Sequence, residues 1–192
     1  MSELRVIIAG GGTGGHLFPA LAIGDELKSR GTDVMYMGSI YGIEAKQYRD
    51  RNEKMRLLNI RGIHRSFSMA SIGQNLLFPF KFVIGYIESV FTIIKFNPQV
   101  VVGTGGYASG LPLLAALLLK KKTLLQEQNS FPGITTRLFA DKAKRICVGF
   151  NESEKNLDSK TVLTGNPIRK GIENGNRIKG LKEFSFKENN KT

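Results

Sequence analysis

The sequence of 192 residues contains one cysteine, no tryptophan and only two histidines. A single cysteine, Cys147, excludes an internal disulfide and a zinc site built on several cysteines. Its place in the apolar run Arg-Ile-Cys-Val predicts a small core side chain, as is typical of a protein from a reducing compartment. The chain also lacks a basic stretch followed by a long apolar segment at its start, so we expect no signal peptide and a cytoplasmic protein.

Acidic residues are scarce, with 16 Asp and Glu against 28 Lys and Arg, and the net charge is +12. This excess favours an anionic partner, and nucleic acid, anionic lipid or a diphosphate substrate would each fit. No nucleic-acid-binding motif accompanies the charge, so we expect no nucleic acid partner. No group of His, Asp and Glu has the spacing of metal ligands, and we expect neither a metal nor another cofactor.

Long hydrophobic runs are also few. Residues 76–96 are apolar enough to suggest a membrane span, but they contain Lys81, Glu88, Lys95 and Pro79. A charge at the centre of a bilayer costs about 2.5–3.5 kcal/mol. We therefore expect this segment to form a buried or interfacial helix.

Short apolar runs alternate with helix-like stretches along the chain. The expected strands are residues 4–9, 33–38, 56–60, 99–102, 123–126, 145–148 and 161–164, and the expected helices are residues 19–30, 42–51, 72–95, 109–120 and 133–140. Several strands are rich in Val and Ile on both faces, which is typical of a parallel sheet covered by helices. The alternation predicts an α/β fold with a Rossmann-like, doubly wound parallel sheet. For residues 171–192, which are polar and basic, we expect no complete element.

A glycine-rich loop follows the first expected strand, with the sequence Gly-Gly-Gly-Thr-Gly-Gly-His over residues 10–16. Consecutive glycines let the backbone turn sharply and approach a ligand closely. Pro19 suits the first turn of the helix behind the loop, and a helix N-terminus favours anions. The pattern indicates a site for an anion or a sugar, with a purely structural tight turn as the alternative.

The same loop satisfies the G-x-G-x-x-G fingerprint of dinucleotide-binding proteins. That fingerprint needs an acidic residue at the end of the second strand, which here ends Met-Gly-Ser, and a helix that starts earlier than Pro19. Both features disfavour NAD or FAD. His16 closes the loop and is a candidate proton acceptor near neutral pH, the alternative being a residue that caps the helix or bonds the loop backbone.

Two further motifs follow expected strands: Gly-Thr-Gly-Gly-Tyr-Ala-Ser-Gly over residues 103–110, and Gln-Glu-Gln-Asn over residues 126–129 ahead of Pro132 and Gly133. Loops at the carboxyl ends of parallel strands line one crevice, where open α/β sheets bind ligands. We therefore expect both motifs to face the crevice of the first loop, although simple loop solvation would also explain the polar run.

Together these motifs resemble the GT-B glycosyltransferase family that converts lipid I to lipid II in peptidoglycan synthesis. The resemblance is carried by residues 11–20, 101–110, 127–133 and 164–169 and runs from about residue 4 to residue 169. Members of that family have two Rossmann-like domains that face each other across a cleft. The resemblance implies that residues 1–164 form the N-terminal, acceptor-side domain, and that residues 165–192 begin the interdomain linker and a truncated C-terminal domain.

The activity implied by the resemblance is inverting hexosyl transfer. N-acetylglucosamine would move from UDP-N-acetylglucosamine to lipid I, the undecaprenyl-diphospho-muramoylpentapeptide, with this chain supplying the acceptor and membrane half. The implied location is peripheral, on the cytoplasmic face of the cell membrane, with a separate C-terminal half or other cell-wall enzymes as partners. Two alternatives stay open: a non-catalytic, membrane-docking acceptor subunit that recruits a donor-binding partner, and a transferase with another lipid acceptor on the same scaffold.

The resemblance also implies residue roles. His16 would be the catalytic base, with Glu127 as the second candidate. Contacts to UDP-N-acetylglucosamine would come from Thr13, Gly14, Gly15, Asn129 and Arg169, and contacts to the acceptor from Gly105, Gly106, Tyr107 and Glu127.

An anionic membrane surface is the remaining expected partner. Residues 72–95 hold a dense set of aromatic and aliphatic side chains, with Lys81 among them and Arg61 and Arg65 shortly before. Apolar side chains beside basic residues are typical of reversible surface binding. The alternative is a core helix, although the sequence Phe-Pro-Phe at residues 78–80 is expected to interrupt regular helix and expose aromatic rings.

Overall fold

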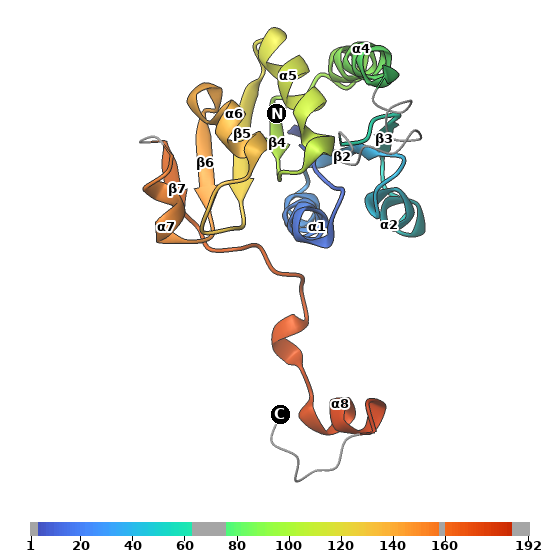
Figure 1. Ribbon diagram of the computed structural model, residues 1–192. Coiled ribbons are helices and arrows are strands. Elements are labelled where there is room, and N and C mark those ends of the chain that lie inside the picture. The colour runs from blue at the N-terminus through green and yellow to red at the C-terminus, as the bar shows by residue number, and fades with distance from the viewer. Residues whose placement is uncertain (1–3, 63–75, 158–159, 186–192) are drawn as a thin grey trace.

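The computed structural model describes residues 4–62, 76–157 and 160–185, and seven strands in these residues form one parallel sheet (Figure 1). The strands are β1 (Arg5–Ala9), β2 (Asp33–Ser39), β3 (Met55–Leu58), β4 (Val100–Gly103), β5 (Lys122–Glu127), β6 (Arg145–Val148) and β7 (Thr161–Leu163). Their order in the sheet is β3-β2-β1-β4-β5-β6-β7. The chain thus builds outward from β1 in one direction and then returns to build outward from β4 in the other, which confirms the doubly wound α/β fold.

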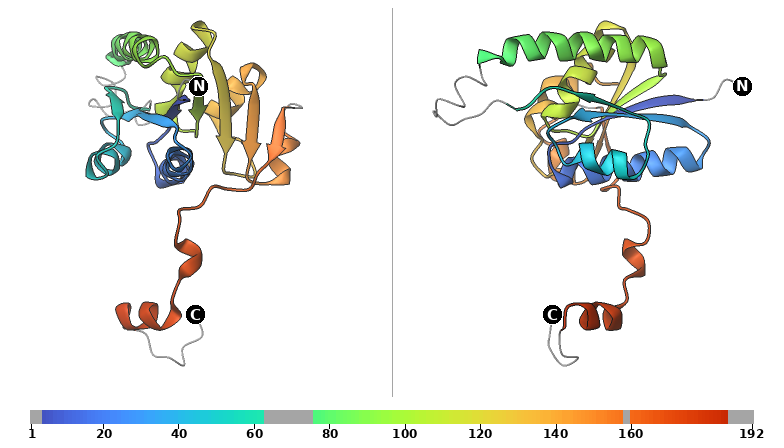
Figure 2. Two further views of the ribbon diagram at one scale, coloured as in Figure 1. Left: turned by 180° about the vertical axis from the view of Figure 1, so that it is seen from behind. Right: turned by 90° about the vertical axis from the view of Figure 1, so that its right-hand side faces the viewer.

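Helices follow the strands, and all but the last lie in the connections from one strand to the next. They are α1 (Gly14–Ser29), α2 (Glu44–Asp50), α4 (Phe78–Phe96), α5 (Gly110–Leu118), α6 (Ile134–Phe139), α7 (Asn151–Glu154) and α8 (Arg177–Glu183), with short 3-10 turns η1 (Tyr107–Ser109), η2 (Ala140–Lys142) and η3 (Ile172–Asn174). Helix α8 lies apart from the sheet, at the end of an extended segment that follows β7 (Figures 1 and 2).

Two hydrophobic cores lie on opposite faces of the sheet. Helices α1 and α2 cover one face, and α4 and α5 cover the other (Figure 2). Within β1, successive side chains alternate between the cores: Ile7 belongs to the core under α4 and α5, and Ile8 to the core under α1. Because both are fully buried, the strand is apolar on both sides, as the sequence predicts for a parallel sheet with two covered faces.

Strands β1 and β4 are adjacent in the sheet, with Ala9 paired in register with Gly103. The strand order reverses between them, because the connection from β1 goes to β2 on one side and β4 continues to β5 on the other. Loops diverge at such a switch point and leave a crevice at the carboxyl ends of the strands. The fold therefore brings the two glycine-rich loops to one place.

Helix α1 begins at Gly14, and the expected start at residue 19 is wrong. Thr13 is the N-cap residue in an extended conformation, and its carbonyl accepts hydrogen bonds from the N–H groups of His16 (3.2 Å) and Leu17 (3.0 Å). Pro19 lies inside the helix, where it removes only the bond that would reach the carbonyl of Gly15. The helix start therefore no longer argues against a dinucleotide site, whereas the missing acid at the end of β2 still does.

Two other expectations about helices are wrong. Pro79 lies in the first turn of α4 and does not interrupt it. The N–H that proline lacks would have no acceptor within the helix at that position. The polar tail contains the complete helix α8, whose N-cap residue Asn176 accepts a hydrogen bond from the N–H of Lys179 at 3.0 Å. Residues 72–75 of the expected helix 72–95 lie outside the described residues.

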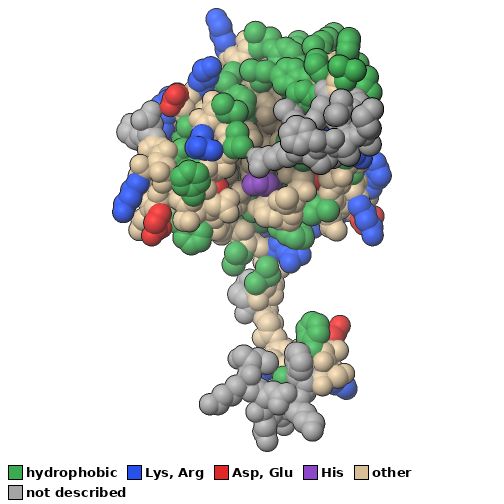
Figure 3. Space-filling model, viewed as in Figure 1, with side chains coloured by type: hydrophobic (Ala, Val, Ile, Leu, Met, Phe, Trp, Pro, Cys, Tyr) green, Lys and Arg blue, Asp and Glu red, His purple; other side chains and the backbone are tan. Residues whose placement is uncertain are grey.

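Helix α4 buries only a narrow stripe, Gly85, Ser89 and Ile93, spaced four residues apart. Its other faces expose large apolar side chains, which Figure 3 shows gathered over this helix. Among the residues that the structure describes, no helix combines the length and hydropathy that crossing a bilayer requires.

Candidate functional site

The two glycine-rich loops touch each other beyond β1 and β4. A Cβ atom added to Gly106 would lie 2.2 Å from the carbonyl oxygen of Gly11, and one added to Gly10 would lie 1.9 Å from the Thr104 hydroxyl. Gly106 also has a φ of 75°, in the left-handed region that side chains disfavour. Only glycine at these positions allows both loops to share the crevice.

His16 occupies the gap between the loops from the first turn of α1. Its ring lies against the second loop, where a Cβ atom on Gly105 would come within 2.7 Å of Nδ1. Nδ1 lies 3.1 Å from the carbonyl oxygen of Thr104 and 3.1 Å from Oε1 of Gln128. The Gln128 amide is oriented by its Nε2 group, which donates to the same Thr104 carbonyl at 2.7 Å.

These contacts determine which ring nitrogen of His16 carries the proton. Both atoms facing Nδ1 are acceptors, so Nδ1 must donate in order to bond them. A neutral imidazole protonated at Nδ1 presents its lone pair at Nε2. His16 is therefore prepared to accept a proton at Nε2. Gln128 helps to hold the ring in this orientation. In the sequence, Gln128 belonged to the polar run at residues 126–129 and had no predicted role of its own.

Glu127 is buried at the end of β5 and accepts four hydrogen bonds. Oε1 accepts from the backbone N–H and the side-chain amide of Asn129 (3.0 and 2.9 Å), and Oε2 accepts from the N–H of Gly133 (2.9 Å) and the hydroxyl of Thr136 (2.6 Å). A carboxylate with both oxygens so engaged organises the loop between β5 and α6. The geometry favours His16 over Glu127 as a base.

Glu44 has a comparable role under the first loop and was missed by sequence reasoning. Its fully buried carboxylate accepts from the N–H of Gly12 (2.8 Å) and from the N–H of Ser39 (2.9 Å). Nothing in the sequence distinguishes this residue from an ordinary acidic side chain at a helix start. Its partners come from β2 and from the loop after β1, and only the fold brings them together.

Of the residues expected to contact the donor, Thr13, Gly14, Gly15 and Arg169 lie at the first turn of α1. Thr13, Gly14 and Gly15 form that turn, and helix geometry leaves the N–H groups of both glycines without an intrahelical acceptor. The guanidinium of Arg169 lies 4.3 Å from the centre of the Phe18 ring, whose edge packs against Gly14. Asn129 is exposed and adjoins Gln128, which contacts His16.

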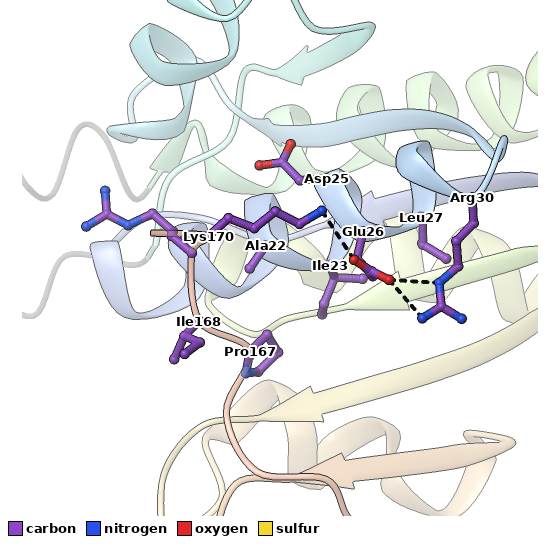
Figure 4. A pocket seen from close by; sticks show the side chains of 10 residues that line it. Ala22, Ile23, Asp25, Glu26, Leu27, Arg30, Pro167, Ile168 and Lys170 are labelled. Carbon is purple, nitrogen blue, oxygen red and sulfur yellow. Dashed lines mark hydrogen bonds and ion pairs between the residues drawn. The ribbon is translucent and has the colours of Figure 1, made fainter. Parts of the chain in front are cut away.

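Arg169 reaches this turn because the segment after β7 crosses α1. Residues Pro167–Lys170 and the later turns of α1 enclose a crevice of about 500 Å³ (Figure 4). Glu26 forms ion pairs there with Arg30 (2.8 Å) and Lys170 (3.5 Å), and the hydrogen bond from Arg30 lowers the pKa of Glu26. Exposed ion pairs stabilise little, so these two pairs hold the segment only weakly against α1.

A larger cavity, about 820 Å³, opens beside His16. The expected acceptor residues Gly105, Gly106, Tyr107 and Glu127 all line it, so the structure brings them together with His16. Beyond these polar groups the walls are mainly apolar and come from α4, α5, α6 and the segment after β3: Ile60, Phe78, Phe82, Leu111, Leu114, Ile134, Leu138 and Phe139. The shape and lining suit an amphipathic ligand whose polar end reaches the loops. In the described part of the chain, no group of three or more His, Cys, Asp or Glu side chains could hold a metal ion.

The comparisons with known proteins agree with this geometry. Residues 6–148 match the glycosyltransferase family 28 N-terminal domain. The chain is 38% identical to the UDP-N-acetylglucosamine--N-acetylmuramyl-(pentapeptide) pyrophosphoryl-undecaprenol N-acetylglucosamine transferase of Flavobacterium psychrophilum, over 100% of this chain and 53% of that protein. It is 44% identical to the protein of the same name from Lactococcus lactis, over 85% of this chain and 46% of that protein.

A solved structure gives the same result. MurG from Acinetobacter baumannii superposes with a TM-score of 0.71 and 28% identity, covering 88% of this chain and 47% of that one. A UDP-N-acetylglucosamine 2-epimerase from Rickettsia bellii, at 15% identity and a TM-score of 0.60, shares the fold alone. The chain spans about half the length of the curated relatives it matches.

The buried carboxylate of Glu44 gives a first test of how the site is held. In Glu44→Gln, one carboxylate oxygen becomes an NH₂ group that faces a backbone N–H, so one buried donor loses its acceptor. We expect a loss of about 1–3 kcal/mol in the free energy of unfolding, measured by urea denaturation. The matched control Glu26→Gln, on the exposed side of α1, should leave the unfolding midpoint nearly unchanged. Equal midpoints for the two variants would show that Glu44 does not hold the loop.

Proposed function

Because the chain belongs to glycosyltransferase family 28, we propose that it forms the acceptor half of an enzyme that transfers N-acetylglucosamine from UDP-N-acetylglucosamine to lipid I, giving lipid II. The observation that carries this proposal is the position of His16, between two glycine loops and at the polar end of an apolar cavity. In this proposal residues 1–164 form the acceptor domain, and residues 165–192 begin the connection to a donor-binding domain.

The proposed reaction is a single displacement with inversion. Nε2 of His16 takes the proton of the acceptor sugar hydroxyl, and that oxygen forms a bond to the anomeric carbon of N-acetylglucosamine. The bond between the anomeric carbon and the diphosphate breaks, and UDP leaves with the bonding electrons. The N-terminus of α1, with the N–H groups of Gly14 and Gly15, stabilises the negative charge that develops on the departing diphosphate.

The proposed division into an acceptor domain and a donor-binding domain can be tested directly. We expect the 192-residue chain alone to release no UDP from UDP-N-acetylglucosamine and lipid I, because most donor contacts would come from a second domain. A chimera that joins residues 1–169 to the C-terminal half of the Flavobacterium psychrophilum relative should release UDP and form lipid II. Turnover by the chain alone would refute the division, and an inactive, folded chimera that binds UDP-N-acetylglucosamine would refute the acceptor role.

The role of His16 can be measured in the same chimera. His16→Ala should lower the transfer rate roughly 10²–10⁴-fold, the usual contribution of an acid–base group, with little change in the affinity for UDP-N-acetylglucosamine. The ring fills the gap between the loops, so the thermal stability of the variant must be checked alongside the rate. A nearly unchanged rate in a stable variant would make His16 a loop-structuring residue only.

Membrane docking through α4 is the second part of the proposal. Phe80 and Phe91, which are 69% and 67% exposed, belong to a large apolar surface with few polar groups. Lys95 lies at the end of the helix, and Lys81 and Arg61 both lie over the ring of Tyr41 at one edge of this surface. Apolar side chains insert between lipids while adjacent cations attract anionic headgroups. Arg65 lies outside the described residues.

The docking surface can be tested by vesicle co-sedimentation. The variant Phe80→Ser/Phe91→Ser changes only exposed rings, whereas Phe78 packs against the core and is kept. Wild type should pellet with anionic vesicles, less with neutral vesicles and less at high salt, and the double variant should stay in solution. The control Ile178→Ser removes an equally exposed side chain from α8 and should have no effect. If the double variant pellets like wild type, α4 does not face the membrane.

A further inference from the structure

The proposed sugar transfer uses only the polar end of the large cavity and assigns no role to its apolar part. Its polar end is formed by His16 and the second glycine loop, and its walls then continue between α4, α5 and α6. Phe82 and Leu114 line the cavity and are also partly exposed, 36% and 37%, at the edge of the apolar surface of α4. The cavity therefore runs from the candidate base to the proposed membrane surface with apolar walls along the way.

Gly110 shows that part of this space is left open. It is the first residue of α5, with φ −61° and ψ −51°, a conformation that any residue adopts. Apart from its chain neighbours and the backbone of its own helix, no atom of the described residues lies within 4 Å of a Cβ added at this position. Gly85 differs, because a Cβ there would lie 2.8 Å from the Leu111 side chain, so helix packing explains that glycine. Neither backbone geometry nor a neighbour among the described residues explains glycine at position 110, which lines the cavity.

We propose that this cavity binds the first isoprene units of a polyprenyl diphosphate carrier. This inference rests on the proposed function in one respect: it takes from it that the acceptor is a lipid diphosphate. In this arrangement the diphosphate lies at the second glycine loop, near Gly106, and the first isoprene units pass beside Gly110 between α5 and α6. The rest of the chain leaves past Phe82 and Leu114 into the bilayer, so that apolar carbon crosses no water.

A cavity-filling substitution tests this arrangement on the 192-residue chain. Gly110→Leu should fold, because the backbone is helical and the side chain enters open space, and it should occupy the room for the isoprene units. The probe is farnesyl diphosphate, kept below its micelle concentration and compared with inorganic diphosphate by calorimetry. Wild type should bind farnesyl diphosphate at least about tenfold more tightly than inorganic diphosphate, since buried apolar carbon adds affinity.

The matched control is Gly180→Leu, at a glycine of α8 that also has no neighbour of the described residues within 4 Å of an added Cβ. Gly110→Leu should lose about tenfold or more in affinity for farnesyl diphosphate and keep its affinity for inorganic diphosphate, whereas Gly180→Leu should match wild type. Unchanged binding of farnesyl diphosphate by folded Gly110→Leu, or no preference of wild type for the prenylated probe, would overturn the proposal.

This outcome is separable from the proposed function. The binding measurement needs neither the sugar donor nor turnover, so it can succeed where the chimera forms no lipid II. Conversely, an active chimera in which Gly110→Leu transfers equally well to acceptors with long and short prenyl chains would refute the prenyl site and leave the glycosyltransferase assignment in place.

Discussion

The close contact between the two glycine loops is the constraint on which the candidate site depends. Gly106 lies against the carbonyl of Gly11, and the ring of His16 packs on Gly105 in the remaining gap. Any side chain at these glycines would separate the loops and move His16 away from Thr104 and Gln128. The glycines thus have two effects. They leave room for the ring of His16, and they let a ligand approach the backbone closely.

The buried carboxylates of Glu44 and Glu127 hold the loops around this site in place. Glu44 holds the first loop through the N–H of Gly12, and Glu127 holds the loop after β5 through Gly133 and Thr136. Each carboxylate is stabilised by N–H or O–H donors from segments that are distant in sequence or held in tight turns. The oxygens of both carboxylates accept from backbone and side-chain donors of the loops. The groups that face the crevice then include the helix N-terminus and His16.

The two covered faces of the sheet differ in their outer surfaces. On one face, α1 ends in a network of charged side chains that includes Arg51, Lys28 and Glu53. On the other, α4 exposes aromatic and aliphatic side chains and buries only its small stripe. The large cavity opens toward the second face, so in the proposed function the lipid-linked acceptor approaches from there and the donor from the side of α1 and Arg169.

The sequence alone determined the strand and helix pattern, the parallel sheet and the crevice where the glycine loops meet, because apolar periodicity and glycine runs are local signals. It misjudged the start of α1, where the extended Thr13 caps the helix and overrides the preference of Pro19. Only the tertiary structure decided that Glu44 lies under the first loop, that Gln128 orients His16, and that Gly110 meets no side chain of the described residues. Each of these facts depends on contacts between segments far apart in the chain, or on their absence, and no local pattern of residues encodes them.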